Sequence, residues 1–587
     1  MSSRPLTLIR LVAALVLVSA RGSNTPTRPQ GCEFWVAPAP AGSNSNPGTL
    51  ALPWATLDYA SAQTLALGGS YCTVWFKDGT YDGLNRIGER FATPITFRAA
   101  NPFKVIFQNS GPALQVAGGY NLIFDGFQFR HTGTGADQVV VHVFGAGNLW
   151  PEQIVFRNNI FHDSYNNDLL TLNTGGRFIT VEGNIFYNQQ GSDEHIDVNG
   201  VTDITIQDNI FFNDFAGSGR SNANDTAAFV VIKDSDGIIP GTERVAVRRN
   251  IFLNWEGSDV SKFVQIGEDG KPYYEAKDVR VENNLMIGNS GNVLHAAFGV
   301  RGGKDVIFAN NTVVGNLPSR AYAFRLDHKG SNPPNQNIYF YNNIWSDPTG
   351  TMGAPGWGGN IRFSDGSSGE TNNLILDNNL YWNGGAAIPP GQQINPLVHD
   401  VRRVVTDPLL NTDQSGVILP RWNASNSSFV SGNTTIRQEF VRLVEQYGNL
   451  PTNSPAIGRA DPAVAPADDI LGQMRPVPAS LGAYEAGWGL SGTSDLTAVY
   501  LRWTDPRQPS AASLTITYTL GATSALVTGL PVATRAYTLT NLQPYSLYVV
   551  TLTARDGGNA ILAQSNSFLV LTTDRHAYLP LVKKNSP

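Results

Sequence analysis

The chain has 587 residues, more than one ordinary hydrophobic core accommodates, so we expect several folded units or one long repeat array. Its formal net charge of -6, with no stripe of basic residues, excludes the electrostatic footprint of a nucleic-acid-binding protein. The 59 glycines and 35 prolines, and the near absence of helical periodicity, favour a turn-rich all-β protein.

The first twenty residues predict a secretory signal peptide. Arg4 and Arg10 precede the apolar run LVAALVLVSA, which ends at small residues near Ala20. No other apolar run reaches the roughly 18 residues that span a bilayer, so we expect no transmembrane segment in the mature chain. We therefore expect an extracellular monomer, either free or held at the cell surface. In that oxidising compartment Cys32 and Cys72 either close one loop or stay as free thiols.

A strand–turn–strand motif with an asparagine in its turn recurs from residue 154 onward. Examples are IVFRNNIFHDS, ITVEGNIFYNQ and ITIQDNIFFND. The recurring residues are Asn159, Asn184, Asn209, Asn250, Asn284, Asn311, Asn343 and Asn379. The interval is 25 residues between the first three and then varies from 27 to 41. Such a unit cannot bury its own apolar face, so it must stack on its neighbours.

The alternation inside each motif predicts an apolar inner face and a polar outer face, with Ile204 and Ile206 inward and Thr205 and Gln207 outward. Stacking at about 4.8 Å would place the asparagines above one another as a hydrogen-bonded ladder. A leucine-rich repeat is the competing solenoid, but no regular leucine spacing is present. The pattern therefore predicts a parallel β-helix.

Two terminal segments strengthen this prediction. The stretch from Phe34 to Ala60, followed by TVWFKDGTY from Thr73, resembles the entry region of right-handed parallel β-helix proteins that include polysaccharide lyases. The stretch from Ser454 to Gly487 resembles their exit region. The resemblance implies a right-handed parallel β-helix with N- and C-terminal caps over residues 32–487.

A second unit is expected over residues 490–574. Short alternating strands surround Trp503, and Leu542, Pro544 and Tyr548 resemble the tyrosine-corner region of fibronectin type III modules. We expect a fibronectin type III-like β-sandwich that acts as a spacer or presents the β-helix, with glycan binding as the alternative. Residues 575–587 then form a C-terminal tail, in which an apolar patch with basic residues indicates a sorting or attachment signal.

The stretch QQGSDEHIDVNG places three carboxylates within five positions of a weakly charged chain. If Ile196 and Val198 point inward, His195 and Asp197 point outward, and Asp193 and Glu194 lie in the entering turn. Asp168 precedes Asp193 by 25 residues, which is one coil, and should stack beside it. An exposed, solvated acidic turn is the simpler interpretation of the stretch taken alone.

A lysine is predicted next to these acids. Val230 and Ile232 read as inward positions one coil later, which sends Lys233 outward into the column of Asp197. Four carboxylates in adjacent coils cannot all ionise cheaply, and Ca²⁺ is the cation that best accepts several of them in irregular geometry. A cation beside an amine suits β-elimination at a uronic acid, in which the lysine, if its pKa is lowered, removes the C5 proton.

This arrangement resembles the polysaccharide lyase family 9 pectate lyases. In that family a Ser-Asp-Asp-x-x-Asp segment and an Asp one coil upstream bind calcium, and a lysine one coil downstream is the base. The matching residues are Ser192, Asp193, Glu194 and Asp197 in the segment, Asp168 upstream and Lys233 downstream. The chain departs from the family pattern at Glu194, Leu169 and His195, where the family has Asp, Gly and Gly.

Two functions follow as hypotheses. The first is a secreted calcium-dependent lyase that cleaves acidic, pectate-like polysaccharide, with Lys233 as catalytic base and Asp168, Asp193, Glu194 and Asp197 as metal ligands. The second is a non-catalytic, extracellular glycan-binding or adhesin-type β-helix protein. An inverting hydrolase would need a second, opposed pair of acids, which the sequence does not offer.

Overall fold

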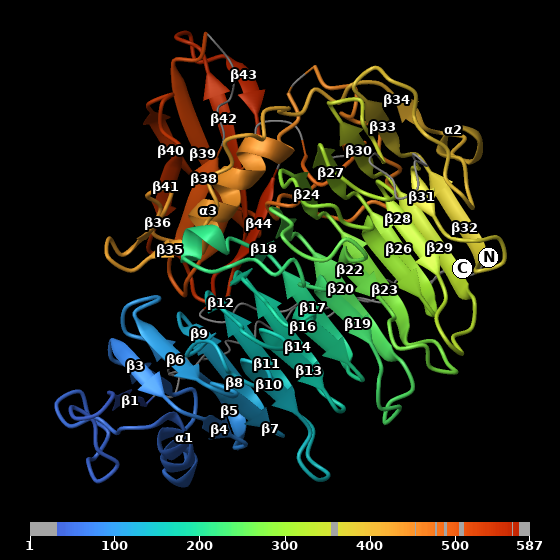
Figure 1. Ribbon diagram of the computed structural model, residues 1–587. Helices are drawn as coiled ribbons and strands as arrows, with labels where there is room; N and C mark the ends of the chain where they lie inside the picture. Colours follow the sequence, from blue (N-terminus) through green and yellow to red (C-terminus); the bar gives the residue numbers. More distant parts are fainter. Residues whose placement is uncertain are drawn as a thin grey trace, which may run out of the picture.

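The computed structural model describes residues 32–353, 362–451, 453–475, 478–485, 490–503, 510–565 and 567–573. The predicted signal peptide, residues 1–20, and the predicted tail, residues 575–587, lie outside this part. Three long sheets of parallel strands dominate the described chain (Figure 1). Successive strands pass from one sheet to the next, and each pairs with its counterpart in the following coil. The chain is therefore an all-β protein with a parallel β-helix, as predicted.

Each sheet runs along the whole solenoid. Sheet 1 contains β1 (Glu33–Val36), β2 (Thr73–Phe76), β5 (Arg90–Ala99), β8 (Tyr120–Asp125), β11 (Glu152–Arg157), β14 (Arg177–Glu182), β17 (Thr202–Gln207), β20 (Thr242–Arg248), β23 (Ala276–Glu282), β26 (Gly303–Ala309), β29 (Asn335–Tyr341) and β32 (Thr371–Asp377). Sheet 2 contains β3 (Gly79–Asp82), β6 (Val105–Asn109), β9 (Gln128–His131), β12 (Ile160–His162), β15 (Ile185–Tyr187), β18 (Ile210–Phe212), β21 (Ile251–Phe252), β24 (Leu285–Gly288), β27 (Thr312–Gly315), β30 (Ile344–Asp347), β33 (Leu380–Asn383) and β34 (Val404–Val405). Sheet 3 contains β4 (Asn85–Ile87), β7 (Leu114–Ala117), β10 (Val141–Phe144), β13 (Leu170–Asn173), β16 (Glu194–Asn199), β19 (Ala228–Lys233), β22 (Lys262–Ile266), β25 (Ala296–Arg301), β28 (Phe324–Asp327) and β31 (Ser364–Asp365).

Like residues stack inside the solenoid. Phe161, Phe186 and Phe211 occupy the same position in three successive coils, and their ring centroids are 4.6 and 5.0 Å apart. These spacings match the distance between neighbouring strands, so each ring packs on the one below. The core is thus built one coil at a time, and no coil could bury its own apolar side chains alone.

The predicted asparagine ladder is present. Nδ2 of Asn159 donates to Oδ1 of Asn184 at 3.1 Å, and the same bond joins Asn184 to Asn209. The pattern continues through the other five ladder asparagines, at 2.9 to 3.1 Å. At the last coil Asn379 donates instead to the buried carboxylate of Asp400, which ends the ladder.

The residue before each ladder asparagine explains the first polar position of the motif. Asn158, Asp208 and Asn283 have φ between 53° and 58°, the left-handed region, and the equivalent Gly183 has φ 63°. Asn, Asp and Gly tolerate this conformation best. The motif therefore combines one residue that makes the turn with one that makes the ladder.

The outer face of sheet 2 differs from the expected polar one. Ile185, Ile210 and Leu285 point away from the solenoid interior into a second apolar cluster with Phe440 and Leu443. The segment after the last coil supplies those partners. Its elements are α2 (Pro396–His399), β35 (Trp422–Asn423), β36 (Ser428–Phe429), α3 (Ile436–Leu443) and a π-helical turn, Val444–Gly448. Sheet 2 is thus covered, so the uncovered faces are where a ligand can be sought.

The N-terminal end is closed by helix α1 (Leu57–Ala66), which packs against β1 and β4. Thr56 caps it, and its side chain accepts a hydrogen bond from the backbone N–H of Tyr59. Cys32 and Cys72 are joined by a disulfide, so of the two alternatives the chain forms the closed loop. Within the described residues, no helix combines the length and apolar character needed to cross a bilayer.

The C-terminal unit has its own core. It pairs β37 (Leu490–Ser494), β38 (Val499–Trp503) and β41 (Ala536–Leu539) in one antiparallel sheet, and β39 (Ser513–Leu520), β40 (Thr523–Leu530), β42 (Leu547–Arg555), β43 (Ile561–Gln564) and β44 (Phe568–Leu571) in another. The oxygen of Tyr548 accepts a hydrogen bond from the backbone N–H of Gln543 at 2.9 Å, the contact expected of a tyrosine corner. Membership of the fibronectin type III family stays a prediction.

Candidate functional site

The predicted site residues lie on sheet 3, in three neighbouring strands. Leu170 of β13, Ile196 of β16 and Val230 of β19 pair with one another and are buried in the interior. Asp168, Asp193 and Glu194 lie at the start of these strands, whereas Asp197 and Lys233 lie further along them. The structure therefore brings all five residues to one wall of the solenoid.

The predicted register of Lys233 was wrong by two residues. Asp197 pairs with Thr171 and with Val231, while Lys233 pairs with Asn199 in the next outward row. A shift of two keeps the same side chains outward, so alternation alone cannot detect it. The two side chains still interact, because the charge of Lys233 lowers the pKa of Asp197 and the charge of Asp197 raises the pKa of Lys233.

Three of the four predicted acids converge. Asp168, Asp193 and Glu194 each offer a carboxylate oxygen, and these oxygens all lie within 4.8 Å of one another. Asp168 and Glu194 are only 4% and 3% exposed. Asp168 is held in place because it accepts hydrogen bonds from the Thr171 hydroxyl at 2.7 Å and the Glu194 N–H at 2.9 Å. Asp197 lies next to these three residues, but it is not one of the converging carboxylates.

Burial shifts the titration of these acids. It is the main cause that raises the pKa of Asp193 to about 6, with the charge of Asp168 next, and that raises the pKa of Asp197 to about 8. The same cause raises the pKa of Glu194 well above its usual value and also raises that of Asp168. The surroundings therefore do not stabilise the negative charge that the group would carry if every carboxylate were ionised.

A hard cation fits this donor set. All the converging groups are carboxylate oxygens, the ligands that Ca²⁺ prefers. Oδ1 of Asp197 is buried without a hydrogen-bond partner among the described residues, and so is Oδ1 of Asp225, whose charge also raises the pKa of Asp193. Buried acceptors of this kind are costly unless something satisfies them. Asp225 lies in a long loop, and nothing in the coil spacing pointed to it.

Lys233 forms an ion pair that the sequence did not reveal. Its Nζ donates to Oε2 of Glu268 at 2.7 Å. Burial alone would lower the pKa of Lys233, but the charges of Asp197, Glu194 and Glu268 outweigh burial and raise it above its ordinary value. With these neighbours unneutralised, the amine is charged.

The loop that carries Glu268 is fixed by one buried residue. The carboxylate of Glu275 accepts hydrogen bonds from the backbone N–H groups of residues 268–271, at 2.6 to 3.1 Å. Glu275 has no exposed surface and also accepts from Asn332 at 2.8 Å. Glu268 is therefore positioned toward Lys233 by a rigid loop.

His195 does not point outward as predicted. It is fully buried, its ring lies 4.5 Å from that of Phe229, and Nε2 is 3.1 Å from Oδ1 of Asn213. Burial lowers its pKa to about 3, so it is a neutral core residue. The alternation breaks here because His195 and Ile196 both turn into the interior where β16 begins.

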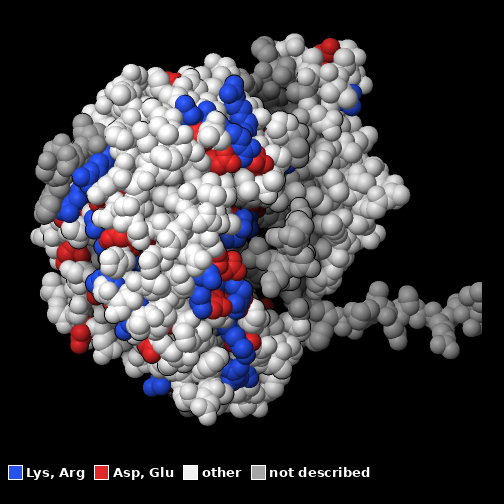
Figure 2. All heavy atoms as spheres, turned by 90° about the vertical axis from the view of Figure 1, so that its right-hand side faces the viewer, with Lys and Arg blue, Asp and Glu red and all other residues white. Residues whose placement is uncertain are grey.

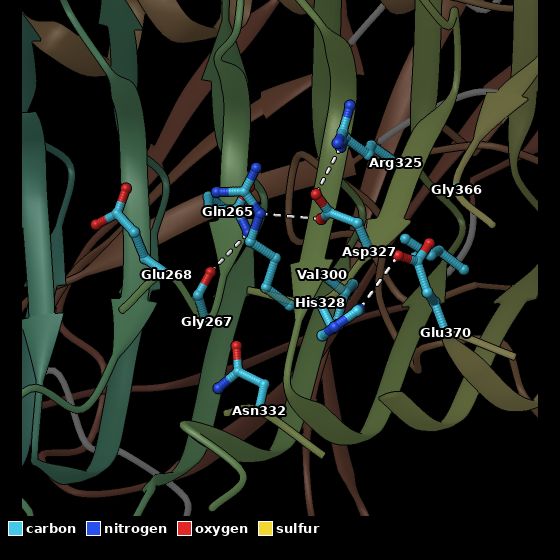
Figure 3. Close-up of polar contacts among 12 residues, drawn as sticks. Gln265, Gly267, Glu268, Val300, Arg325, Asp327, His328, Asn332, Gly366 and Glu370 are labelled. Atoms are coloured by element: carbon cyan, nitrogen blue, oxygen red, sulfur yellow. Dashed lines mark hydrogen bonds and ion pairs between the residues drawn. The ribbon is translucent and has the colours of Figure 1, made fainter. Parts of the chain in front are cut away.

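Beyond Lys233 the same wall becomes basic. Arg301 and Arg325 both contact Asp327, through Nε in each case, at 2.9 and 2.7 Å. Arg325 also reaches Asp365 at 3.0 Å. Figure 3 shows Gln265 on β22 and, two strands further along, Arg325 and Asp327 on β28 with His328 just after it. We call the group formed by Arg301, Arg325, Asp327 and Asp365 the arginine end. We call the group formed by Asp168, Asp193, Glu194 and Asp197 the acid end.

Other basic residues have structural partners. Arg248 and Arg249 both pair with Asp468 and so fasten the C-terminal segment to the β-helix. Arg220 is buried against the ring of Tyr165 and pairs with Asp163. In the view of Figure 2, basic and acidic atoms lie intermixed in a band. Ion pairs thus account for many of the charges that the sequence left without a partner.

No protein-family model and no curated protein sequence matches the chain. Among solved structures it is similar to the FN1–FN3 domains of chicken CNTN1, at 16% identity and a TM-score of 0.14, over 14% of this chain and 30% of that one. PfbA, a surface adhesin of Streptococcus pneumoniae, matches at 14% identity and a TM-score of 0.35, over 56% and 85%. The A-module of the Azotobacter vinelandii mannuronan C-5 epimerase AlgE6 matches at 11% identity and a TM-score of 0.30, over 60% and 94%. The chain thus spans less than a third of the first structure, and the fold assignment rests on its own hydrogen-bonded strands.

Proposed function

We propose that the protein is a secreted, calcium-dependent polysaccharide lyase that cleaves a uronate-containing, pectate-like polysaccharide by β-elimination. One observation carries the proposal: buried carboxylates converge without enough positive charge to balance them, on the same wall as Lys233. The disulfide between Cys32 and Cys72 supports an oxidising, extracellular compartment.

The residues that would hold calcium are Asp168, Asp193 and Glu194, with Asp197 next to them. A calcium ion bound there would pair with a sugar carboxylate and acidify its neighbouring C5 proton. The chain itself supplies the preorganisation, because Thr171 and the Glu194 N–H fix the orientation of the Asp168 carboxylate.

Lys233 is proposed as the base. Its Nζ takes the C5 proton, the electron pair of that C–H bond becomes the C4–C5 double bond, and the C4–O bond breaks. The leaving oxygen is protonated by solvent, so one product carries an unsaturated uronate. An amine accepts a proton only when it is neutral, so the acid end must be neutralised before the pKa of Lys233 returns toward a useful range.

A second function is favoured by one contact. The 2.7 Å ion pair between Lys233 and Glu268 holds the lysine in its charged form, which suits the binding of an anionic glycan better than proton abstraction. The protein would then be a non-catalytic, extracellular glycan-binding or adhesin-type β-helix. For residues 490–574 we retain a fibronectin type III-like module, supported by the Tyr548 contact, as a spacer.

The decisive experiment is a turnover assay on pectate, alginate and glycosaminoglycans that follows the ultraviolet absorbance of unsaturated uronates, with and without a chelator. We expect absorbance only with calcium, and we expect Lys233→Ala to lower turnover by about 10²- to 10⁴-fold. Lys277→Ala is the matched control, since Lys277 pairs with Glu243 on sheet 1. Full turnover by Lys233→Ala would remove it as the base, and binding without cleavage would favour the adhesin.

A further inference from the structure

The arginine end has an excess of positive charge. Within the described residues, Lys262, Arg301, Arg325 and Arg362 face two carboxylates, Asp327 and Asp365. His295 also contacts Asp365, but burial lowers its pKa to about 4, so it adds no charge at neutral pH. Three arginines against two acids leave a local excess of positive charge, to which Lys262 adds only in part because burial lowers its pKa to about 7, and this excess suits an anionic ligand.

Arg301 and Arg325 retain donors for such a ligand. Both are partly exposed, with 21% and 29% of their side chains accessible. In the described part of the chain Arg301 uses only Nε in its pair with Asp327, which leaves both of its terminal nitrogens available. Arg325 keeps only Nη2 among the described contacts, because its Nε contacts Asp327 and its Nη1 contacts His295 and Asp365. A guanidinium presents its donors in a fixed fork that matches a carboxylate.

A buried acceptor lies beside these donors. Gln265 is 3% exposed, and its Nε2 donates to the carbonyls of Ile266 and Gly267. That fixes the amide and leaves Oε1 buried without a partner among the described residues. An acceptor in this position is costly unless a ligand hydroxyl donates to it.

Gly299 makes room for this arrangement. It occupies the outward row between Gln265 and Arg325. A Cβ at Gly299 would lie 2.4 Å from Oε1 of Gln265 and 3.0 Å from Cδ of Lys262. A larger residue at this position would displace the Gln265 amide, so glycine leaves the space that the Gln265 and Lys262 side chains occupy over this strand.

We propose that Arg301, Arg325 and Gln265 form a second subsite, which binds the carboxylate and one hydroxyl of an acidic sugar unit. The inference deepens the proposed function and rests on it only for the acidic substrate class. Gln265 and Arg325 lie in the row of Asp197, two and four strands further along sheet 3, which is about 10 and 19 Å. Arg301 lies in the next outward row, on the strand between them. A bound polysaccharide would therefore reach the subsite several units away from the unit at the acid end.

The test measures binding separately from cleavage. The full chain carrying Lys233→Ala is titrated calorimetrically with uronate hexamers prepared from pectate, from alginate and from a glycosaminoglycan, and with the methyl ester of each. We expect Arg301→Gln and Arg325→Gln to weaken binding of at least one acidic hexamer by tenfold or more and to leave its ester unchanged. Arg301→Lys should lie between the two, because it keeps the charge and loses the fork.

Arg280→Gln is the matched control, since Arg280 pairs with Glu282 on sheet 1. Circular dichroism and thermal unfolding check that each variant folds. If Arg301→Gln does not fold, Arg301→Lys tests the same position. The subsite is overturned if Arg301→Gln, Arg325→Gln and the Arg280→Gln control all bind every acidic hexamer with the same affinity. Arginine-dependent binding, together with no ultraviolet product from the wild-type chain, would sustain the subsite and contradict the lyase. Product formation by the wild-type chain with unchanged affinities of the arginine variants would do the reverse.

Discussion

The acid end and the arginine end occupy consecutive strands of one sheet, yet their carboxylates behave in opposite ways. Burial acts to raise the pKa of Asp327, but Arg301 and Arg325 outweigh it and lower that pKa. At Asp365 the hydrogen bond from His295, followed by the charge of Arg325, also lowers the pKa. At the acid end the charge of Lys233 and a hydrogen bond from Asn199 oppose the effects of burial and of the neighbouring acids but do not outweigh them, and the pKa of Asp197 rises to about 8.

The difference shows that burial does not decide the state of a carboxylate on this wall. Asp327 and Asp197 are each 6% exposed, and at both of them burial is the largest single effect and raises the pKa. The supply of positive charge differs. The chain provides its own cations at the arginine end and too few at the acid end. We therefore expect a metal ion at the acid end and a substrate anion at the arginine end.

The largest expected effect tests the acid end directly. Glu194→Gln removes one of the three converging carboxylates and should weaken calcium binding by about 100-fold, measured by calorimetry. Asp327→Asn, at the arginine end, should leave calcium affinity unchanged. If the two variants behaved alike, the contrast between the ends would be lost.

A pH series sharpens the contrast. In chelator, the folded pKa of Asp193 is about 6 against about 3.9 for an unfolded aspartate, so the folded state binds more protons between these values. The contribution of Asp193 to stability is present below pH 4 and is lost as the pH rises through about 6, by about 1–2 kcal/mol after allowance for partial exposure. Denaturant unfolding of the wild type and Asp193→Asn at several pH values measures it. A difference between the two that is constant with pH would contradict the shift.

The smallest expected effect concerns the support of Asp168. Thr171→Val keeps the shape of the side chain and removes the 2.7 Å hydrogen bond to that carboxylate. The loss of about 1 kcal/mol should lower calcium affinity roughly fivefold. Thr205→Val on sheet 1 serves as the control. An unchanged affinity in Thr171→Val would show that Asp168 needs no such support.

Much of the fold was predictable because its determinants are local and repeated. Asn184 and Asn209 occur at the same place in the motif, and a single stacking rule then predicts the ladder. The closeness of the acids was predictable for the same reason, although the expected 25-residue step was wrong by one: β13 and β16 pair with an offset of 26 residues, so the Glu194 N–H, and not Asp193, stands against the Asp168 carboxylate. Where the coil length is constant, sequence distance translates directly into spatial neighbours.

The errors arise where that regularity ends. The loop between Asp214 and Thr226 lengthens one coil, so the row of Lys233 could be fixed only to within a multiple of two residues. Arg301 and Arg325 were missed because the asparagine motif marks sheets 1 and 2, while their strands belong to sheet 3. The alternation in KFVQI and AFGVR was a signal that could have found them. Ion pairs such as Lys233 with Glu268 join loops whose paths no periodic pattern predicts.

Asp400 gives the molecule a finite length. A row of identical amides can accept another amide at its open end, and a solenoid with a bare last coil offers an edge to which a second chain can add. Asp400 accepts hydrogen bonds from the Asn378 and Asn379 N–H groups, from the Asn379 side chain and from the Tyr381 hydroxyl. An ionised carboxylate accepts hydrogen bonds and donates none, so Asp400 cannot pass the amide pattern on to a further chain.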